Sequence, residues 1–90
     1  MLSDVDLEQI LSRCLASSPG PWRSFVEGRD HECGSNFIMV GPENARCEDI
    51  ELMGASINDQ DFIANAKQDV PVLVSEIKRL RALLTDKKKA

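Results

Sequence analysis

One stretch of the sequence has residue types that resemble a chemical site: Asp30, His31, Glu32 and Cys33. His31 and Cys33 offer a nitrogen and a sulfur that can bind metals, and Cys47 is a third potential ligand. Structural zinc sites normally use four ligands in paired spacings such as Cys-x-x-Cys, whereas here a His-x-Cys pair is followed by one cysteine fourteen residues later. We therefore expect a polar hairpin loop with no metal and no cofactor.

Catalytic patterns are equally weak. A Cys33 nucleophile with His31 as its base would need electropositive surroundings, which the acidic neighbours oppose. The segment Gly41-Pro42-Glu43-Asn44 lacks the glycine spacing and the lysine of a phosphate-binding loop. Carboxylates such as Asp59 and Asp61 are typical of helix caps or solvent-facing positions, and acid–base catalysis would need a desolvated pocket around one of them. The sequence predicts no catalytic residues and a protein that is not an enzyme.

The most distinctive segment is Pro19-Gly20-Pro21-Trp22. Its prolines fix the backbone and its glycine permits a turn, which favours an indole that fills the core. The alternative is that Trp22 and Arg23 line a groove, because a rigid aromatic ring is a good anchor for a ligand or partner. Arg29 and Arg46 would join them in holding a nucleotide or another anion.

Ninety residues allow one domain with a small core, residues 1–90, and such a core usually needs a disulfide, a metal or self-association to support it. Three cysteines at irregular spacings, with no apolar leader recognised before them, indicate a reducing cytoplasm. Without disulfides or a metal, we expect oligomerisation to stabilise the small core.

A net charge of −4 makes binding to nucleic acid through a broad basic surface improbable. No apolar run approaches the roughly 20 residues that a membrane-spanning helix needs, so we expect no membrane partner. The lysines near the C-terminus are typical of a solvated helix end, a basic tail over residues 87–90.

The elements that position these residues follow from the apolar pattern. Ser3 and an acidic first turn begin an amphipathic helix over residues 1–16. Residues 22–57 then read as an antiparallel sheet of three or four strands, with runs at 22–26, 36–40 and 49–53 separated by glycines. The class is α+β.

Residues 59–86 predict a kinked pair of helices, the first capped by Asn58 or Asp59. We expect a break near Pro71, at residues 68–70, because proline removes a backbone donor. The apolar positions of the second helix advance by three, four, three and four residues, which is the seam of a left-handed coiled coil over two heptads. We expect an oligomer interface made by Val70, Leu73, Ile77, Leu80 and Leu84.

Two segments resemble a known family. Residues 15–22, Leu-Ala-Ser-Ser-Pro-Gly-Pro-Trp, and residues 59–66, Asp-Gln-Asp-Phe-Ile-Ala-Asn-Ala, followed by Asp69-Val70-Pro71 and a Leu-rich helix, are similar to the Ead-like early-region proteins of lambdoid phages and prophages. The resemblance covers about half of the chain, with Ser18 in place of the usual threonine, and leaves the stretch from Gly28 to Ile57 unidentified. It implies an accessory role during infection of a bacterial host and brings no catalytic residues.

Three hypotheses follow. The first is a homo-oligomeric, non-enzymatic accessory protein of phage or prophage type that binds and modulates a host protein in the bacterial cytoplasm. The second is a small-ligand module that holds an anion, or a structural oligomeric domain. The third, an enzyme acting through His31 and Cys33, is the least favoured.

Overall fold

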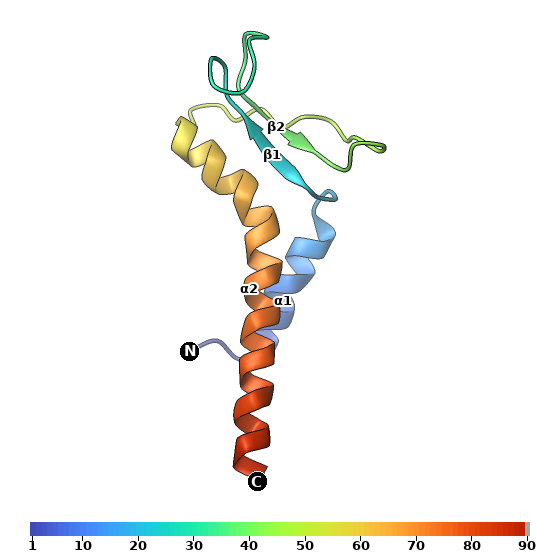
Figure 1. Cartoon of the computed structure of the whole chain (residues 1–90), viewed down its shortest axis with the longest axis vertical. Coiled ribbons are helices and arrows are strands. Elements are labelled where there is room, and N and C mark those ends of the chain that lie inside the picture. The colour runs from blue at the N-terminus through green and yellow to red at the C-terminus, as the bar shows by residue number, and fades with distance from the viewer. Residues whose placement is uncertain (90) are drawn as a thin grey trace.

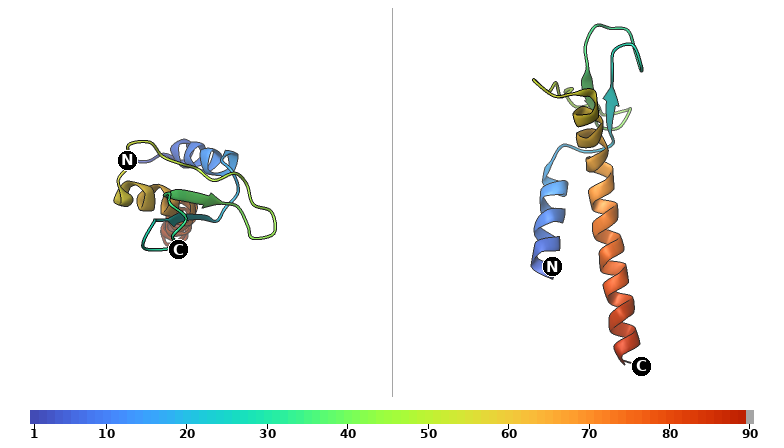
Figure 2. Two further views of the ribbon diagram at one scale, coloured as in Figure 1. Left: turned by 90° about the horizontal axis from the view of Figure 1, so that it is seen from above. Right: turned by 90° about the vertical axis from the view of Figure 1, so that its left-hand side faces the viewer.

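The computed structural model describes the backbone of residues 1–89 and the side chains of residues 1–86. Its elements are helix α1 (Asp4–Ala16), strands β1 (Trp22–Phe25) and β2 (Phe37–Val40), and helix α2 (Ile57–Lys89). The class is α+β, as predicted. Figure 1 shows a small sheet at one end and α2 running almost the full length of the molecule, and Figure 2 shows α1 beside α2.

Helix α1 begins as the sequence predicts. The Ser3 hydroxyl accepts the Asp6 N–H at 3.0 Å, and the Asp6 carboxylate accepts the Ser3 N–H at 2.8 Å. These reciprocal bonds form a capping box that satisfies backbone donors left open at the helix start. Leu7 is the one buried residue of this helix, and it faces α2.

The sheet has two antiparallel strands, so the prediction of three or four strands is wrong. Trp22 pairs with Val40 at one end of the ladder and Phe25 with Phe37 at the other. The third predicted run contributes a single bridge, in which Ile38 and Ile50 exchange backbone hydrogen bonds of 2.8 and 2.9 Å. Apart from this bridge, residues 49–53 form no ladder with β2 in the described structure.

The prediction of two C-terminal helices broken near Pro71 is also wrong, because α2 is continuous from Ile57 to Lys89 with Pro71 inside it. Figure 1 shows a bend in α2: the first part slants across the sheet and the rest follows the long axis. Bending of this kind relieves the clash between a proline ring and the preceding turn. Residues 87–89 belong to the helix backbone, and the predicted basic character of the 87–90 tail lies outside the described side chains.

The cap of α2 is Ser56 rather than Asn58 or Asp59. The Ser56 hydroxyl accepts the Asp59 N–H at 3.0 Å, and the Asp59 carboxylate accepts the Ser56 N–H at 3.1 Å. Asp59 is therefore the reciprocal partner of the cap, three residues into the helix.

The core is small and lies between the sheet and the first part of α2. Ile38, Val40 and Ala64 are fully enclosed, and Trp22, Ile50 and Leu52 pack around them. The Cα radius of gyration is 17.0 Å, whereas a compact chain of this length would have about 12 Å. The molecule is thus elongated, with extents of 59 × 27 × 19 Å, and much of α2 lies outside the core.

Candidate protein-binding surfaces and polar sites

An apolar stripe runs along α2, and we call it the α2 seam. Its members follow a heptad repeat of three- and four-residue steps: Ile63, Ala66, Val70, Leu73, Ile77, Leu80 and Leu84. Because α2 is continuous through Pro71, the repeat begins one heptad earlier than the sequence analysis placed it. Three heptads approach the length at which a coiled-coil pattern becomes specific.

The described structure leaves most of this seam uncovered. Leu73 is 59% exposed, and Leu80 and Leu84 are comparably exposed, while Val70 and Ile77 are half-buried. The sheet and α1 occupy other faces of the helix. Gln60, Ala64 and Gln68 face the sheet, on the opposite side of α2 from the seam.

Helix α1 packs on a face adjacent to the seam. Lys67 donates to the Cys14 carbonyl at 2.8 Å, Lys78 pairs with Glu8, and the Arg81 guanidinium bonds Asp4 at 2.9 Å. These contacts place α1 antiparallel to the middle of α2, roughly a quarter-turn from the seam at about 100° per residue. Beyond Arg81, α2 continues without α1, as both side views show.

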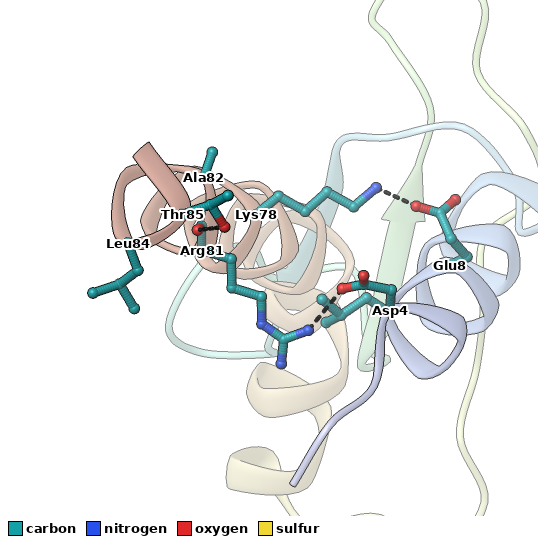
Figure 3. Close-up of a pocket in the computed structure, with 8 residues that line it drawn as sticks. Asp4, Glu8, Lys78, Arg81, Ala82, Leu84 and Thr85 are labelled. Carbon is teal, nitrogen blue, oxygen red and sulfur yellow. Dashed lines mark hydrogen bonds and ion pairs between the residues drawn. The ribbon is translucent and has the colours of Figure 1, made fainter. Parts of the chain in front are cut away.

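A groove of about 660 Å³ lies between the two helices near the start of α1. Figure 3 shows the Asp4 and Glu8 carboxylates reaching toward Arg81 and Lys78 across it, with Leu84 on the far side of α2. Exposed ion pairs of this kind contribute little stability. The groove adjoins the uncovered part of the seam at Leu84.

A second apolar surface lies at the start of α2, and we call it the Phe62 patch. Phe62 is 75% exposed, and the neighbouring Met53 and Ile57 are also exposed. Two shallow depressions share Phe62, and their linings include Asp59 and Asp69. Seam residues also line them, so the patch adjoins the first part of the α2 seam: Ile63, Ala66, Val70 and Leu73. Aromatic and methionine side chains with a charged rim are typical of protein interfaces.

The four residues proposed from the sequence as an anion site do not come together. Trp22 is half-buried against the core, its indole N–H donates to the Ser18 carbonyl at 3.1 Å, and Lys67 lies 5.6 Å from its ring centroid. Arg29 lies in the loop between the strands, where it forms a bidentate pair with Asp61 at 2.8 and 3.0 Å.

The Arg29–Asp61 pair joins the loop to α2. Hydrogen bonds from Arg29, and then from Ser24, lower the pKa of Asp61 to about 2. The hydrogen bonds that Arg29 donates to Asp61, and then to Asp30, raise the pKa of its own guanidinium. The guanidinium is committed to these carboxylates and is not available to a ligand in this arrangement.

Arg23 and Arg46 do meet. They line one polar cavity of about 140 Å³, together with Pro21, Met39, Gly41 and Glu43. Neither guanidinium has a hydrogen bond or ion pair among the described side chains. Two arginines facing one small cavity are suited to an oxyanion, although the Glu43 carboxylate opposes it.

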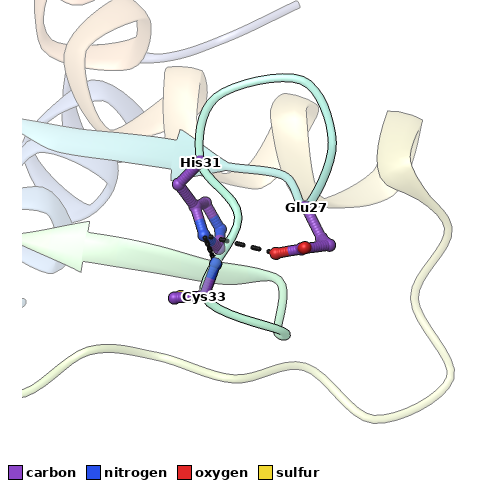
Figure 4. A group of neighbouring side chains, drawn as sticks. All are labelled: Glu27, His31 and Cys33. Atoms are coloured by element: carbon purple, nitrogen blue, oxygen red, sulfur yellow. Dashed lines mark hydrogen bonds and ion pairs between the residues drawn. The ribbon is translucent and has the colours of Figure 1, made fainter.

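His31 and Cys33 also meet, but their neighbour is Glu27 and not Cys47. The ligand atoms of Glu27, His31 and Cys33 all lie within 4.8 Å of one another. Figure 4 shows the Glu27 carboxylate directed at the imidazole, with Cys33 beside the ring. All three cysteines of the chain are free thiols, and Cys47 lies after β2, away from this cluster.

Sequence reasoning missed two glutamines that join α2 to the sheet. Gln60 is 4% exposed, and its amide donates to Ser24 Oγ at 2.8 Å and to the Phe25 and Phe37 carbonyls at 3.2 Å. Gln68 bonds the backbone of Trp22. The sequence does carry a signal for this contact. Gln60 and Gln68 lie four residues before and after Ala64, and this spacing puts all three on one face of the helix.

Within the described residues, no helix combines the length and apolarity needed to cross a membrane. In comparisons with known proteins, this chain matches no protein-family model, no curated protein and no solved structure.

Proposed function

We propose that this chain is a non-enzymatic accessory protein that dimerises through the α2 seam and binds a host protein. The observation that carries the proposal is a three-heptad apolar stripe, largely uncovered, on a helix that extends beyond its own domain. An isolated helix is marginally stable in water, and its stability comes mainly from packing an apolar face. A second copy of the same helix supplies that packing.

The charges beside the seam favour a parallel arrangement. In a parallel pair, Glu76 on one helix lies opposite Arg81 of the other. This attractive contact forms twice by symmetry and would replace or share the Glu76–Arg79 and Arg81–Asp4 pairs within each chain. In an antiparallel pair, the side that carries Asp69 and Glu76 would face its own copy, which sets carboxylates against carboxylates. The sheet lies on the opposite face of α2, whereas α1 flanks the seam on the side of Lys67 and Arg81, so a partner helix on the seam would lie beside α1.

The experiment compares charge substitutions on and off the seam. We expect light scattering after size exclusion to give a dimer for the natural chain and a monomer for Leu73→Glu with Leu80→Glu. Val72→Glu is the matched control, because Val72 is 67% exposed and adjacent in sequence but lies off the seam. A natural chain that stays monomeric at high concentration, or a control that dissociates equally, would contradict the proposal.

The Phe62 patch is the proposed contact for the host protein, and its acidic rim favours a basic partner surface. Its size and composition fit a small interface with one aromatic anchor. The resemblance to Ead-like proteins supports a phage- or prophage-type protein acting in a bacterial cytoplasm, and no catalytic role is proposed for any residue.

Photo-cross-linking from position 62 in bacterial cells identifies the partner, and binding is then measured with both purified proteins. We expect Phe62→Ala to weaken binding at least tenfold, and added salt to weaken it further. Leu15→Ala is the control, since Leu15 is 76% exposed on α1, away from the patch. Equal effects of the two substitutions would rule the patch out.

A second candidate is favoured by one observation, the shared cavity of Arg23 and Arg46. It would hold a small oxyanion, such as the phosphate of a nucleotide. A ligand bound there raises the melting temperature, so nucleotides and inorganic phosphate are screened by thermal shift. We expect the shift to vanish in Arg23→Ala and Arg46→Ala and to persist in Arg13→Ala; no shift with any anion would eliminate this candidate.

A further inference from the structure

The loop between the strands, residues 26–36, is folded back on itself and held by its own hydrogen bonds. The Asp30 carboxylate accepts the Val26 N–H at 2.8 Å, and the Asn36 side chain accepts the Glu27 N–H at 2.8 Å. Gly28 and Gly34 both have positive φ, of 82° and 97°, which lets the chain reverse twice within the loop. This folding places three metal-binding side chains together.

The first of these side chains is a fixed imidazole. His31 is 16% exposed in its side chain, and its ring lies against Phe25 and Phe37, with centroid distances of 6.2 and 5.0 Å. Its Nδ1 accepts the Cys33 N–H at 3.0 Å. This bond occupies the one lone pair of Nδ1, so the Cys33 N–H must move away before Nδ1 can bind a metal.

The second is the Glu27 carboxylate. Its Oε2 accepts the Gly34 N–H at 2.7 Å and lies 3.5 Å from His31 Nδ1. Because the Nδ1 lone pair is directed at the Cys33 N–H, the 3.5 Å contact with Glu27 is not a hydrogen bond. A tetrahedral zinc with metal–ligand distances of about 2.0 to 2.2 Å would separate two such atoms by about 3.3 to 3.6 Å. The observed separation fits that geometry.

The third is the Cys33 thiol, which is exposed and therefore free to rotate. All three ligand atoms already lie within 4.8 Å of one another. Metal binding would need a small shift of the Cys33 backbone that opens its hydrogen bond to His31 Nδ1, and a rotation about the Cα–Cβ bond that brings the sulfur closer. A thiolate and a carboxylate together neutralise a divalent cation, and binding to the thiolate releases its proton to solvent.

We propose that Glu27, His31 and Cys33 form a binding site for one zinc ion, with water as the fourth ligand. Mixed nitrogen, sulfur and oxygen ligation suits zinc better than calcium or magnesium, which prefer oxygen alone. The ion would cross-link the two ends of the loop. The site lies at the opposite end of the molecule from the distal part of the α2 seam (Figure 1), so it is independent of the proposed dimer.

The test is calorimetric titration of the full chain, stripped with a chelator, with zinc chloride. We expect one zinc per chain, and at least tenfold weaker binding in Cys33→Ser and in Glu27→Gln. Cys47→Ser and Glu32→Gln are the controls, since both residues are exposed and lie outside the cluster. Cobalt titration gives a second readout, because a cobalt–thiolate absorption band must depend on Cys33.

Substitution of His31 is not decisive, because its ring packs against two phenylalanines and its loss could disturb the loop. Cys33 and Glu27 are exposed, so their variants should keep the melting temperature of the metal-free chain. Failure of the natural chain to bind zinc with a one-to-one ratio would overturn the site. So would Cys33→Ser binding as tightly as the natural chain, or Cys47→Ser weakening it equally.

Discussion

The side-chain amide of Gln68 pairs with the backbone of Trp22 as a neighbouring strand would. Gln68 Oε1 accepts the Trp22 N–H at 2.8 Å, and Gln68 Nε2 donates to the Trp22 carbonyl at 3.0 Å. The Trp22 N–H and carbonyl, at the outer edge of β1, are therefore hydrogen-bonded by a helix side chain instead of by another strand. This connects the first residue of the sheet to the middle of α2, close to the point where the helix bends.

Gln68→Ala should therefore destabilise the fold by about 2 kcal/mol, since it leaves a part-buried donor and acceptor without partners. Urea unfolding followed by Trp22 fluorescence measures this loss directly. Gln9→Ala, at an exposed position of α1, is the matched control and should change stability by less than about 0.5 kcal/mol. Equal midpoints for the two variants would show that the pairing contributes nothing.

The Arg29–Asp61 pair predicts a pH dependence of stability. The pKa of Asp61 is about 2 in the folded chain against 3.8 as its ordinary value, so the folded state prefers the ionised form. The stabilisation is fully present above about pH 4 and is lost as the pH falls through about 2. Stability should rise with pH across this window.

Asp61→Asn removes that contribution. Between pH 4 and pH 2, the melting temperature of the natural chain should fall more steeply than that of Asp61→Asn. Asp49→Asn changes an exposed carboxylate that has no hydrogen bond to another described side chain, so this variant should follow the natural curve. Parallel curves for all three proteins would mean that the loop is not anchored through Asp61.

Gly41 supports the loop that shapes the Arg23–Arg46 cavity, and it tolerates no side chain. Its φ is 96°, and an added Cβ would lie 3.0 Å from the Ala45 carbonyl oxygen and 3.2 Å from the Cys47 nitrogen. Gly28 has a similar φ of 82° but open space around it.

We expect Gly28→Ala to cost about 1 kcal/mol for its backbone conformation alone, and Gly41→Ala about 2 to 3 kcal/mol, because it adds a clash with backbone atoms. Chemical unfolding of the two variants side by side isolates the steric part. A smaller loss of unfolding free energy in Gly41→Ala than in Gly28→Ala would show that the segment after β2 moves to make room for the added Cβ.

The sequence was sufficient for the elements with strong local signals. The Ser3–Asp6 cap and the apolar period of residues 1–16 identify α1, and the heptad steps from Val70 to Leu84 identify the exposed stripe of α2. These features depend on residues close together in the chain, where spacing alone fixes which side chains share a face.

The features that the sequence did not predict depend on tertiary contacts. Pro71 removes one hydrogen bond, which locally favours a break, but turns on both sides are held by the sheet and by α1, so the helix continues. Ala64 and Gln60 are buried while Phe62 is exposed, which hydropathy cannot reveal. Glu27 joins His31 and Cys33 only because two glycines reverse the loop, so spacing in the sequence pointed to Cys47 instead.

Disulfide cross-linking along α2 tests the proposed parallel dimer most directly. In a chain whose three native cysteines are serines, Leu73→Cys and Leu84→Cys lie on the seam, and Val72→Cys lies off it. A parallel, in-register pair brings identical seam positions within disulfide distance at both sites, whereas an antiparallel pair can do so at one site at most. We predict covalent dimers from positions 73 and 84 and none from position 72. Monomers at all three positions, or equal cross-linking at 72, would contradict the account.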